Sequence, residues 1–308
     1  MKRITKLAFG LGAACLAAGE IMYERYLNYD VIKLINSHSK NDFDYLTSSP
    51  LFKEGCEWFD EMATGDTEIY SPYLKRPIYS VIIPNKNENK CNKWAFIVHG
   101  YTADVKSMSH YAKVYYEKGY NILMPHMVAH TPDKAKYISM GYYDRYMLLD
   151  WIEYILTLYP DDEIILHGVS MGAATVMLTS GESLPENVKT VIADCGYSSC
   201  YEEYASQMKI MRIPTEPLLS AANLVSKVRG NFDFKECSPL NAVIFSKTPT
   251  LFIHGEDDTF VPFEMMERLY EACSAPKKEM LPIPKAVHAN AVYVNPDLYW
   301  KKVFEFID

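Results

Sequence analysis

The stretch Glu163-Ile164-Ile165-Leu166-His167-Gly168-Val169-Ser170-Met171-Gly172 decides the fold of this chain. Its apolar first half predicts a buried strand, and the small residues at 173–178 that follow predict a helix. A strand, a Gly-x-Ser-x-Gly pattern and a helix in this order are typical of a nucleophile elbow, a sharp turn that raises Ser170 above the edge of a sheet. The two glycines leave room for strand and helix to approach closely. The sequence therefore predicts a nucleophilic Ser170, and the alternative is an ordinary tight turn after a buried strand.

Short apolar strands and helices alternate on both sides of this stretch. Strands are expected over residues 94–98, 120–124, 164–166, 188–193, 250–253 and 279–283, and helices over 107–118, 142–159, 171–180, 263–273 and 296–307. This alternation predicts an α/β fold, a doubly wound and mostly parallel sheet with helices on both faces. An earlier pair of strands within 67–84 is expected to form an antiparallel edge of that sheet.

About 50 residues from Tyr197 onward interrupt the alternation, because they are rich in apolar side chains but contain no predicted strand. We expect a small helical cap over about 197–246, carried by a catalytic domain over 67–308. The region before this domain, residues 23–66, is expected to be a helical segment, since apolar residues recur at helical spacing within 23–60.

The N-terminus combines positive charge with an apolar run. Lys2, Arg3 and Lys6 precede 12 uncharged residues from Leu7 to Ala18. This run is short for a bilayer span of about 20 residues and suits the core of a signal peptide. We expect residues 1–22 to be an export signal or a membrane anchor such as a transmembrane helix, and an anchor would associate the protein with a membrane. The alternative is a helix packed on the domain of a cytoplasmic protein.

The composition and net charge of the chain limit the kinds of partner and cofactor that it could bind. The chain has 308 residues, of which 49% are hydrophobic, so it can bury one large core. The net charge of −8 argues against a nucleic-acid partner. The seven cysteines form no Cys-x-x-Cys pair and no zinc-ligand spacing with histidine, so we expect no metal cofactor and free thiols. A pairing of Cys195 with Cys200 stays open.

A serine hydroxyl needs a general base, and the base needs an acid that orients it. Two histidines follow Ser170 in the chain, His254 and His288. His288 lies in a loop directly after the last predicted strand, and such loops carry the catalytic groups of parallel sheets. The sequence therefore predicts His288 as the base, and His254 is interpreted as a structural residue at a turn.

The segment His254-Gly255-Glu256-Asp257-Asp258-Thr259-Phe260-Val261-Pro262 contains the candidate acids. It resembles the pattern His-Gly-x-x-Asp-x-x-Val-Pro of the α/β-hydrolase superfamily, in particular small bacterial serine hydrolases of the esterase and serine-aminopeptidase-like type. The resemblance extends from about Trp94 to Ile307. It implies Asp258 as the acid of the triad, with Asp257 as the alternative.

The same resemblance implies an oxyanion hole. In the family the residue after a His-Gly pair donates one N–H, and here His99-Gly100 precedes Tyr101. The second donor is the N–H of Met171, because it lies at the start of the helix after the elbow. The loop after the strand that ends near Pro125 departs from the family, whose Asp-x-Arg-Gly-His-Gly pattern matches here only at His130.

Asp144 is interpreted as a charge at a helix N-terminus. The residues together predict a serine hydrolase that needs no cofactor and cleaves a small-molecule carboxylic ester, thioester or amide through an acyl-enzyme. An aminopeptidase-like amidase and an acyltransferase would use the same triad. A non-catalytic binding protein on the same fold is the alternative from another class.

Overall fold

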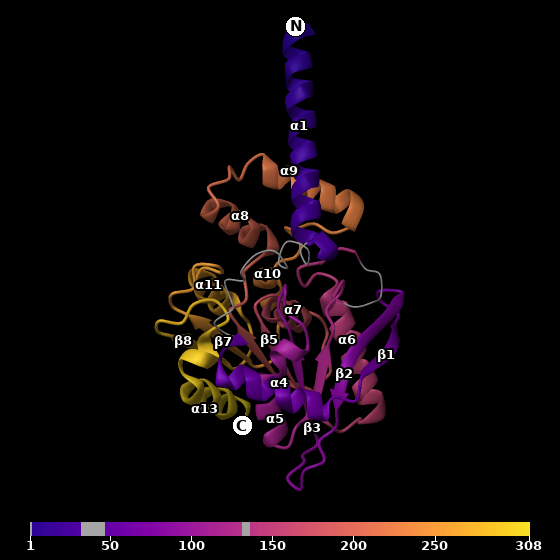
Figure 1. Ribbon diagram of the computed structural model, residues 1–308, viewed down its shortest axis with the longest axis vertical. Coiled ribbons are helices and arrows are strands. Elements are labelled where there is room, and N and C mark those ends of the chain that lie inside the picture. Colours follow the sequence, from indigo (N-terminus) through magenta and orange to yellow (C-terminus); the bar gives the residue numbers. More distant parts are fainter. Residues whose placement is uncertain (1, 32–46, 131–135) are drawn as a thin grey trace.

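The computed structural model describes residues 2–31, 47–130 and 136–308. Its centre is an eight-stranded sheet with the strand order β1-β2-β4-β3-β5-β6-β7-β8 (Figure 1). The strands are β1 (Asp66–Ser71), β2 (Arg76–Ile83), β3 (Lys93–Val98), β4 (Asn121–Pro125), β5 (Glu163–Val169), β6 (Val188–Asp194), β7 (Thr250–Gly255) and β8 (Lys278–Ile283). The strands β1 and β2 are antiparallel to their neighbours, and all the other pairs are parallel. This confirms the predicted α/β fold with an antiparallel edge.

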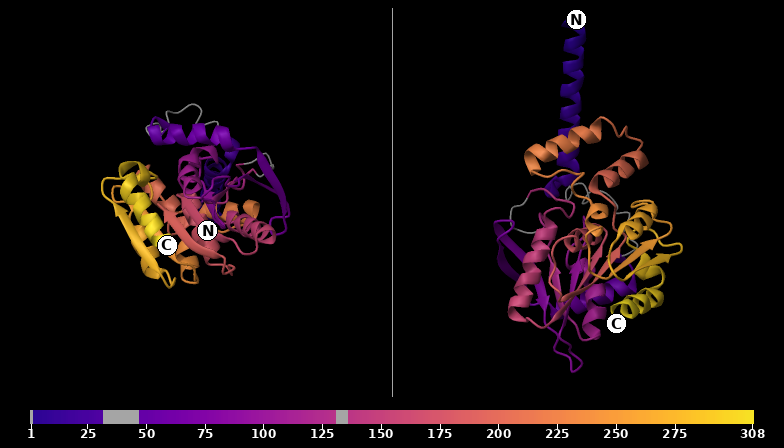
Figure 2. Two further views of the ribbon diagram at one scale, coloured as in Figure 1. Left: turned by 90° about the horizontal axis from the view of Figure 1, so that it is seen from below. Right: turned by 180° about the vertical axis from the view of Figure 1, so that it is seen from behind.

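Helices cover both faces of the sheet (Figure 2). They are α1 (Lys2–Leu27), α4 (Pro50–Met62), α5 (Ser109–Glu117), α6 (Asp144–Leu158), α7 (Met171–Ser180), α8 (Cys200–Ile210), α9 (Leu218–Val225), α10 (Pro239–Val243), α11 (Glu264–Ala272), α12 (Ala291–Val294) and α13 (Pro296–Ile307), with short helical turns at Lys106–Met108 and Ser226–Gly230.

The strand β3 illustrates why the sheet is buried on both sides. Trp94 and Phe96 pack in one apolar cluster with side chains of α6 and α7. Ala95 and Ile97 point to the opposite face and pack in a second cluster with α5 and α13. Successive residues of a strand face opposite sides, so an uninterrupted apolar strand requires a helical layer on each face.

The helices α8, α9 and α10 lie between β6 and β7 in the chain, in the region expected to form a cap. Figures 1 and 2 show α8 and α9 beyond one end of the sheet, with α1 running alongside α9. At Gly19 of α1, an added Cβ would lie 2.7 Å from the backbone carbonyl carbon of Ala221. Tyr23 and Leu27 of α1 are each only 1% exposed. The C-terminal half of α1 is therefore packed against α9 and its surroundings.

The N-terminal region is organised differently from the expected division. Helix α1 continues through the boundary expected at residue 22, and α4 is a separate helix. Residues 32–46 of the helical segment expected over 23–60 lie outside the described residues. Within the described ranges, no helix combines the length and the apolar composition that crossing a membrane requires. The expected transmembrane helix is thus not supported, because the uncharged run of α1 between Lys6 and Glu20 is shorter than the roughly 20 residues that a bilayer span requires.

Candidate active site

Ser170 occupies a strained turn between β5 and α7. Its φ angle is 58°, in the left-handed region that side chains other than glycine rarely adopt. A Cβ on Gly168 would lie 2.2 Å from the carbonyl oxygen of Gly172, and a Cβ on Gly172 would lie 2.0 Å from the carbonyl oxygen of Val98. Both positions therefore accept only glycine unless the backbone moves, and this close packing holds the serine at the tip of the turn.

A chain of hydrogen bonds connects Ser170 with two residues from distant loops. The Oγ of Ser170 lies 2.9 Å from Nε2 of His288, which follows β8. On the other side of the ring, Nδ1 of His288 lies 2.8 Å from Oδ2 of Asp258, which follows β7. Since a carboxylate oxygen only accepts, Nδ1 donates to Asp258, and Nε2 is left to accept the hydroxyl proton of Ser170. The structure thus brings together the three side chains that the sequence singled out.

Asp258 is held by four hydrogen bonds. Its Oδ1 accepts the backbone N–H groups of Phe260 and Val261, each at 2.9 Å. Its Oδ2 accepts from His288 and also lies 3.2 Å from Nε2 of His254. Burial alone would raise the pKa of Asp258, but the hydrogen bonds and charges of His254 and His288 outweigh it and lower the pKa to about 2. The carboxylate therefore stays ionised over the physiological pH range.

His254 has a larger role than the structural turn residue that the sequence predicted, because it helps to hold the candidate acid. Its Nε2 also lies 2.9 Å from the carbonyl oxygen of Val261, so this nitrogen donates to two acceptors. The ring is buried and contacts the same carboxylate oxygen of Asp258 as His288 does. The sequence carries a signal for this role, because His254 precedes the candidate acid Asp258 by four residues. The alternative acid, Asp257, is exposed, and its backbone N–H donates to Ala286.

The two candidate oxyanion donors flank Ser170. Met171 is the first residue of α7 and is fully buried. A Cβ on Gly100 would lie 3.4 Å from Cβ of Ser170 and 3.9 Å from its Oγ, so the Gly100–Tyr101 peptide runs beside the serine. Nδ1 of His99 donates to the carbonyl oxygen of Gly100 at 2.9 Å. Because the carbonyl and the N–H of one peptide point in opposite directions, this bond orients the N–H of Tyr101.

The loop after β4 is fastened to the same region. Asp144 is buried and accepts hydrogen bonds from the N–H of Val128 at 2.7 Å and from Oγ of Ser139 at 2.6 Å. It is thus a loop anchor as well as a charge at the start of α6. His130 lies 2.6 Å from the carbonyl oxygen of Tyr101 through Nε2. The loop that departs from the family pattern therefore supports the backbone of the candidate oxyanion donor.

The surroundings of Asp258 and His288 also contain a buried thiol. Ligand atoms of Cys195, Asp258 and His288 lie within 4.8 Å of one another, which is the one such group among the described residues. Asp258 and His288 are hydrogen-bonded to each other, and burial raises the pKa of Cys195 well above its ordinary value. A thiol that stays protonated is a poor metal ligand, so these atoms fit the hydrogen-bond chain better than a metal site. All seven cysteines, Cys195 and Cys200 included, are free thiols.

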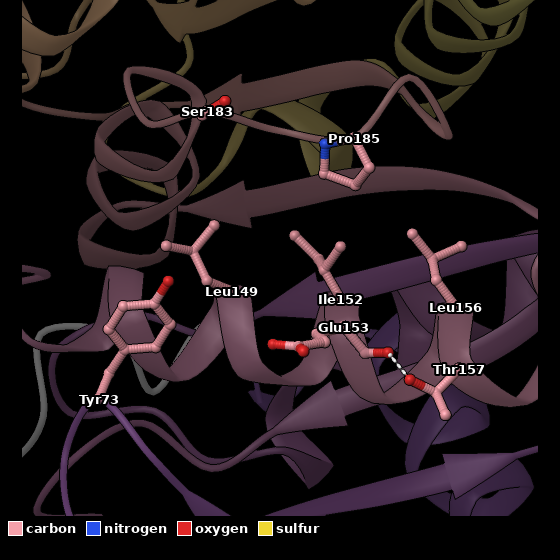
Figure 3. A pocket seen from close by; sticks show the side chains of 8 residues that line it. All are labelled: Tyr73, Leu149, Ile152, Glu153, Leu156, Thr157, Ser183 and Pro185. Carbon is pink, nitrogen blue, oxygen red and sulfur yellow. Dashed lines mark hydrogen bonds between the residues drawn. The ribbon is translucent and has the colours of Figure 1, made fainter.

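A cavity of about 360 Å³ lies along the outer side of α6 (Figure 3). Figure 3 shows Leu149, Ile152 and Leu156 pointing from α6 toward Pro185. None of the residues that line this cavity takes part in the hydrogen-bond chain of Ser170. The cavity is therefore separate from the candidate active site.

Comparison with known sequences agrees with this geometry. The family described as the alpha/beta hydrolase fold matches residues 96–209, and the family described as serine hydrolase (FSH1) matches residues 165–286. The protein YqkD of Bacillus subtilis is 32% identical over 218 residues, which are 69% of this chain and 70% of YqkD. The protein YfhR of Escherichia coli is 30% identical over 47% of this chain and 45% of its own length.

Solved structures share the architecture. The esterase Pf2001 of Pyrococcus furiosus matches with a TM-score of 0.64 and 24% identity, over 80% of this chain and 92% of the esterase. A puromycin-hydrolysing peptidase of Mycobacterium tuberculosis matches with a TM-score of 0.59 and 17% identity, over 79% of this chain and 39% of the peptidase. At these identities the matches show a common fold, and the chemistry has to be argued from the site itself.

Proposed function

This chain belongs to the α/β-hydrolase family of serine hydrolases, and on that premise we propose that it cleaves a carboxylic ester through Ser170, His288 and Asp258. The observation that carries the proposal is the unbroken chain of hydrogen bonds, 2.9 Å from Ser170 to His288 and 2.8 Å from His288 to Asp258. These distances are within the range needed for proton transfer between a nucleophile and its base.

In the proposed reaction, Oγ of Ser170 attacks the carbonyl carbon of the ester while Nε2 of His288 takes its proton. The ring then carries a positive charge, which the ionised Asp258 stabilises through Nδ1. The hydrogen bonds and charges of His254 and His288 outweigh the effect of burial and lower the pKa of Asp258 to about 2, so this carboxylate is charged when the imidazolium forms. His254 acts as a positioning residue, since it holds the carboxylate in place.

The negative charge that develops on the carbonyl oxygen would be received by the N–H groups of Tyr101 and Met171. Both are backbone donors that the fold holds beside the serine, so little reorganisation is needed as the charge forms. The imidazolium of His288 returns its proton to the leaving alcohol. Water, deprotonated by the same ring, then attacks the acyl-enzyme and releases the acid.

The proposal is tested by labelling with a fluorophosphonate and by assay of 4-nitrophenyl acetate, butyrate and octanoate, with the matching 4-nitroanilides as amide substrates. We expect one label, on Ser170, and faster turnover of the esters than of the anilides. The rate of the chemical step should fall at acid pH with the uptake of one proton, because His288 must be neutral to act as a base. Absence of both labelling and hydrolysis in the folded protein would refute the proposal, and faster turnover of the anilides would assign the site to amides.

A further inference from the structure

A carboxyl group that the proposed reaction does not use lies buried in the cap. Glu203 of α8 is 4% exposed. Its Oε1 accepts a hydrogen bond from Nε2 of Gln207 at 2.8 Å, whereas its Oε2 is buried without a hydrogen-bond partner among the described residues. A buried carboxyl oxygen that lacks a partner costs free energy, and folded proteins contain few such atoms.

Glu203 lies on the side of α8 that borders the candidate active site. The Nε2 of Gln207 that bonds Glu203 also donates to the carbonyl oxygen of Phe260 at 2.7 Å. The ring of Phe260 lies 4.8 Å from the ring of His288, measured between centroids. Burial raises the pKa of Glu203 to about 8, and the charge of Asp258 acts in the same direction. The carboxyl of Glu203 and the carboxylate of Asp258 are thus close enough to influence each other.

The next residue of α8 repeats this pattern. The hydroxyl oxygen of Tyr204 is also buried without a hydrogen-bond partner in the described part of the chain. Burial raises the pKa of Tyr204 well above its ordinary value, and Tyr101, which follows Gly100 beside Ser170, contributes to the shift. Two neighbouring residues of the cap therefore each hold a polar atom that is buried without a partner in the described part of the chain.

We propose that Glu203 is a substrate-recognition residue that binds an amino group on the acyl part of the substrate, close to the carbonyl that Ser170 attacks. The inference rests on the proposed hydrolase function and names the substrate class of that same site. An ammonium group supplies both the hydrogen-bond donor that Oε2 lacks and a positive charge. Asp258 adds negative charge nearby, and an aromatic ring such as that of Phe260, beside His288, favours cations over anions.

The raised pKa of Glu203 is compatible with recognition of a cation. With a pKa raised to about 8 by burial and by Asp258, the carboxyl of Glu203 is mostly neutral at pH 7 when no ligand is bound. An ammonium group beside it would favour the ionised form, so binding would release a proton to solvent and leave an ion pair. A hydroxyl group on the substrate would donate the missing hydrogen bond but would not form an ion pair with Glu203. A carboxylate on the substrate would be repelled.

The test compares pairs of 4-nitrophenyl esters that differ by one amino group: glycyl against acetyl and β-alanyl against propionyl. The enzyme with Ser170→Ala gives the background rate for subtraction. We expect at least one amino ester to exceed its amine-free partner in kcat/KM by about 10-fold, because a charge-assisted hydrogen bond contributes on that order. The variant Glu203→Gln, which keeps the size and the bond to Gln207, should reduce this ratio to about 1.

The matched control is Glu202→Gln, one residue earlier in α8. Glu202 forms an ion pair with Arg268 at 2.8 Å and is not part of the site, so this variant should keep the preference for amino esters. A second measurement uses the wild-type enzyme alone: propylammonium should inhibit acetyl ester hydrolysis competitively at concentrations about 10-fold lower than 1-propanol.

The outcomes separate the two proposals. Hydrolysis of the plain esters without any preference for amino esters, and equal inhibition by propylammonium and 1-propanol, would overturn the role of Glu203 and leave the hydrolase function intact. A preference that survives Glu203→Gln would also overturn it. Failure of fluorophosphonate labelling together with failure of all ester hydrolysis would instead refute the hydrolase function on which the inference rests.

Discussion

The elbow around Ser170 and the cap above it are built in opposite ways. In the elbow, β5 and α7 are adjacent in the chain, and the glycines at 168 and 172 contact each other. In the cap, α9 packs against α1, which lies about 200 residues earlier, and Arg229 pairs with Glu24 at 2.9 Å. A region built from adjacent segments can be recognised in the sequence, whereas a region built from long-range contacts becomes visible only in the folded chain. The five predictions below probe this difference, starting with the largest effect.

Substitution of the nucleophile in the elbow should have the largest effect on catalysis. Replacing the nucleophile in Ser170→Ala should lower kcat by roughly 10⁴-fold or more, because no other group can form the acyl-enzyme. Thermal unfolding should be unchanged, since the change removes one oxygen from a half-buried side chain. Fluorophosphonate labelling followed by mass spectrometry provides the check. Labelling of the folded variant at the wild-type rate would contradict the assignment.

The two neighbouring acids should differ sharply. Asp258→Asn should lower kcat by roughly 10⁴-fold, because an amide cannot stabilise the imidazolium of His288 in the same way. Asp257→Asn should have little effect, since that side chain is exposed. Steady-state kinetics of both variants test this, and the reverse ranking would transfer the role of the acid to Asp257.

Substitution of a glycine should destabilise the protein in different ways in the two regions. Gly172→Ala places a Cβ 2.0 Å from the carbonyl oxygen of Val98 and should destabilise the whole domain by about 3 kcal/mol or more. Gly19→Ala places a Cβ 2.7 Å from Ala221 and should separate α1 from α9 while the sheet stays folded. Urea unfolding and limited proteolysis distinguish global from local loss. Identical unfolding midpoints for the two variants would remove the distinction between the regions.

The buried acid of the cap should make stability depend on pH. The pKa of Glu203 is raised from 4.5 to about 8 in the folded protein, so the folded state holds this proton more tightly than the unfolded chain. The resulting contribution to stability is full below pH 4.5 and is lost as pH rises through 8, at about 1.4 kcal/mol for each pKa unit as an upper limit.

Glu203→Gln should therefore gain stability relative to the wild type between pH 6 and pH 9, although Tyr197 and Cys200 also lie within the influence of this carboxyl. Denaturant unfolding at both pH values measures the difference. The variant Glu202→Gln, whose carboxylate is half-buried and paired with Arg268, should not show this gain. A constant difference between Glu203→Gln and wild type across this range would show that the carboxyl is not held in its neutral form.

The smallest effect is expected for the loss of one hydroxyl group that links the body of the domain to the cap. The hydroxyl of Tyr143 donates to the carbonyl oxygen of Asn231 at 2.8 Å and lies 3.0 Å from that of Gly230. Tyr143→Phe should cost about 1 kcal/mol, the usual net contribution of a hydrogen bond. Faster proteolysis of the loop at 226–231 would show that this contact fastens the cap, and an unchanged cleavage rate would show that it does not.

Much of the architecture could be predicted because it depends on short-range patterns. Alternating apolar strands and helices have periods that a single sequence displays, and their order predicted the mostly parallel sheet that the structure has. The division of the N-terminus was harder to predict, since α1 is one continuous helix across residue 22 whose inner half packs on α9. An apolar run with basic residues before it looks the same whether a membrane or another helix covers it.

The sequence by itself determined the α/β fold and the elbow with Ser170, and the order of strands and loops singled out His288. The resemblance of residues 254–262 to a family pattern implied Asp258, with Asp257 as the alternative. Only the tertiary structure decided that His254 shares Asp258 with His288 and that a carboxyl oxygen of Glu203 is buried without a partner. These features arise where loops and helices from separate parts of the chain meet. Burial and hydrogen bonding across such distances leave no local pattern, so they become visible only when the chain is folded.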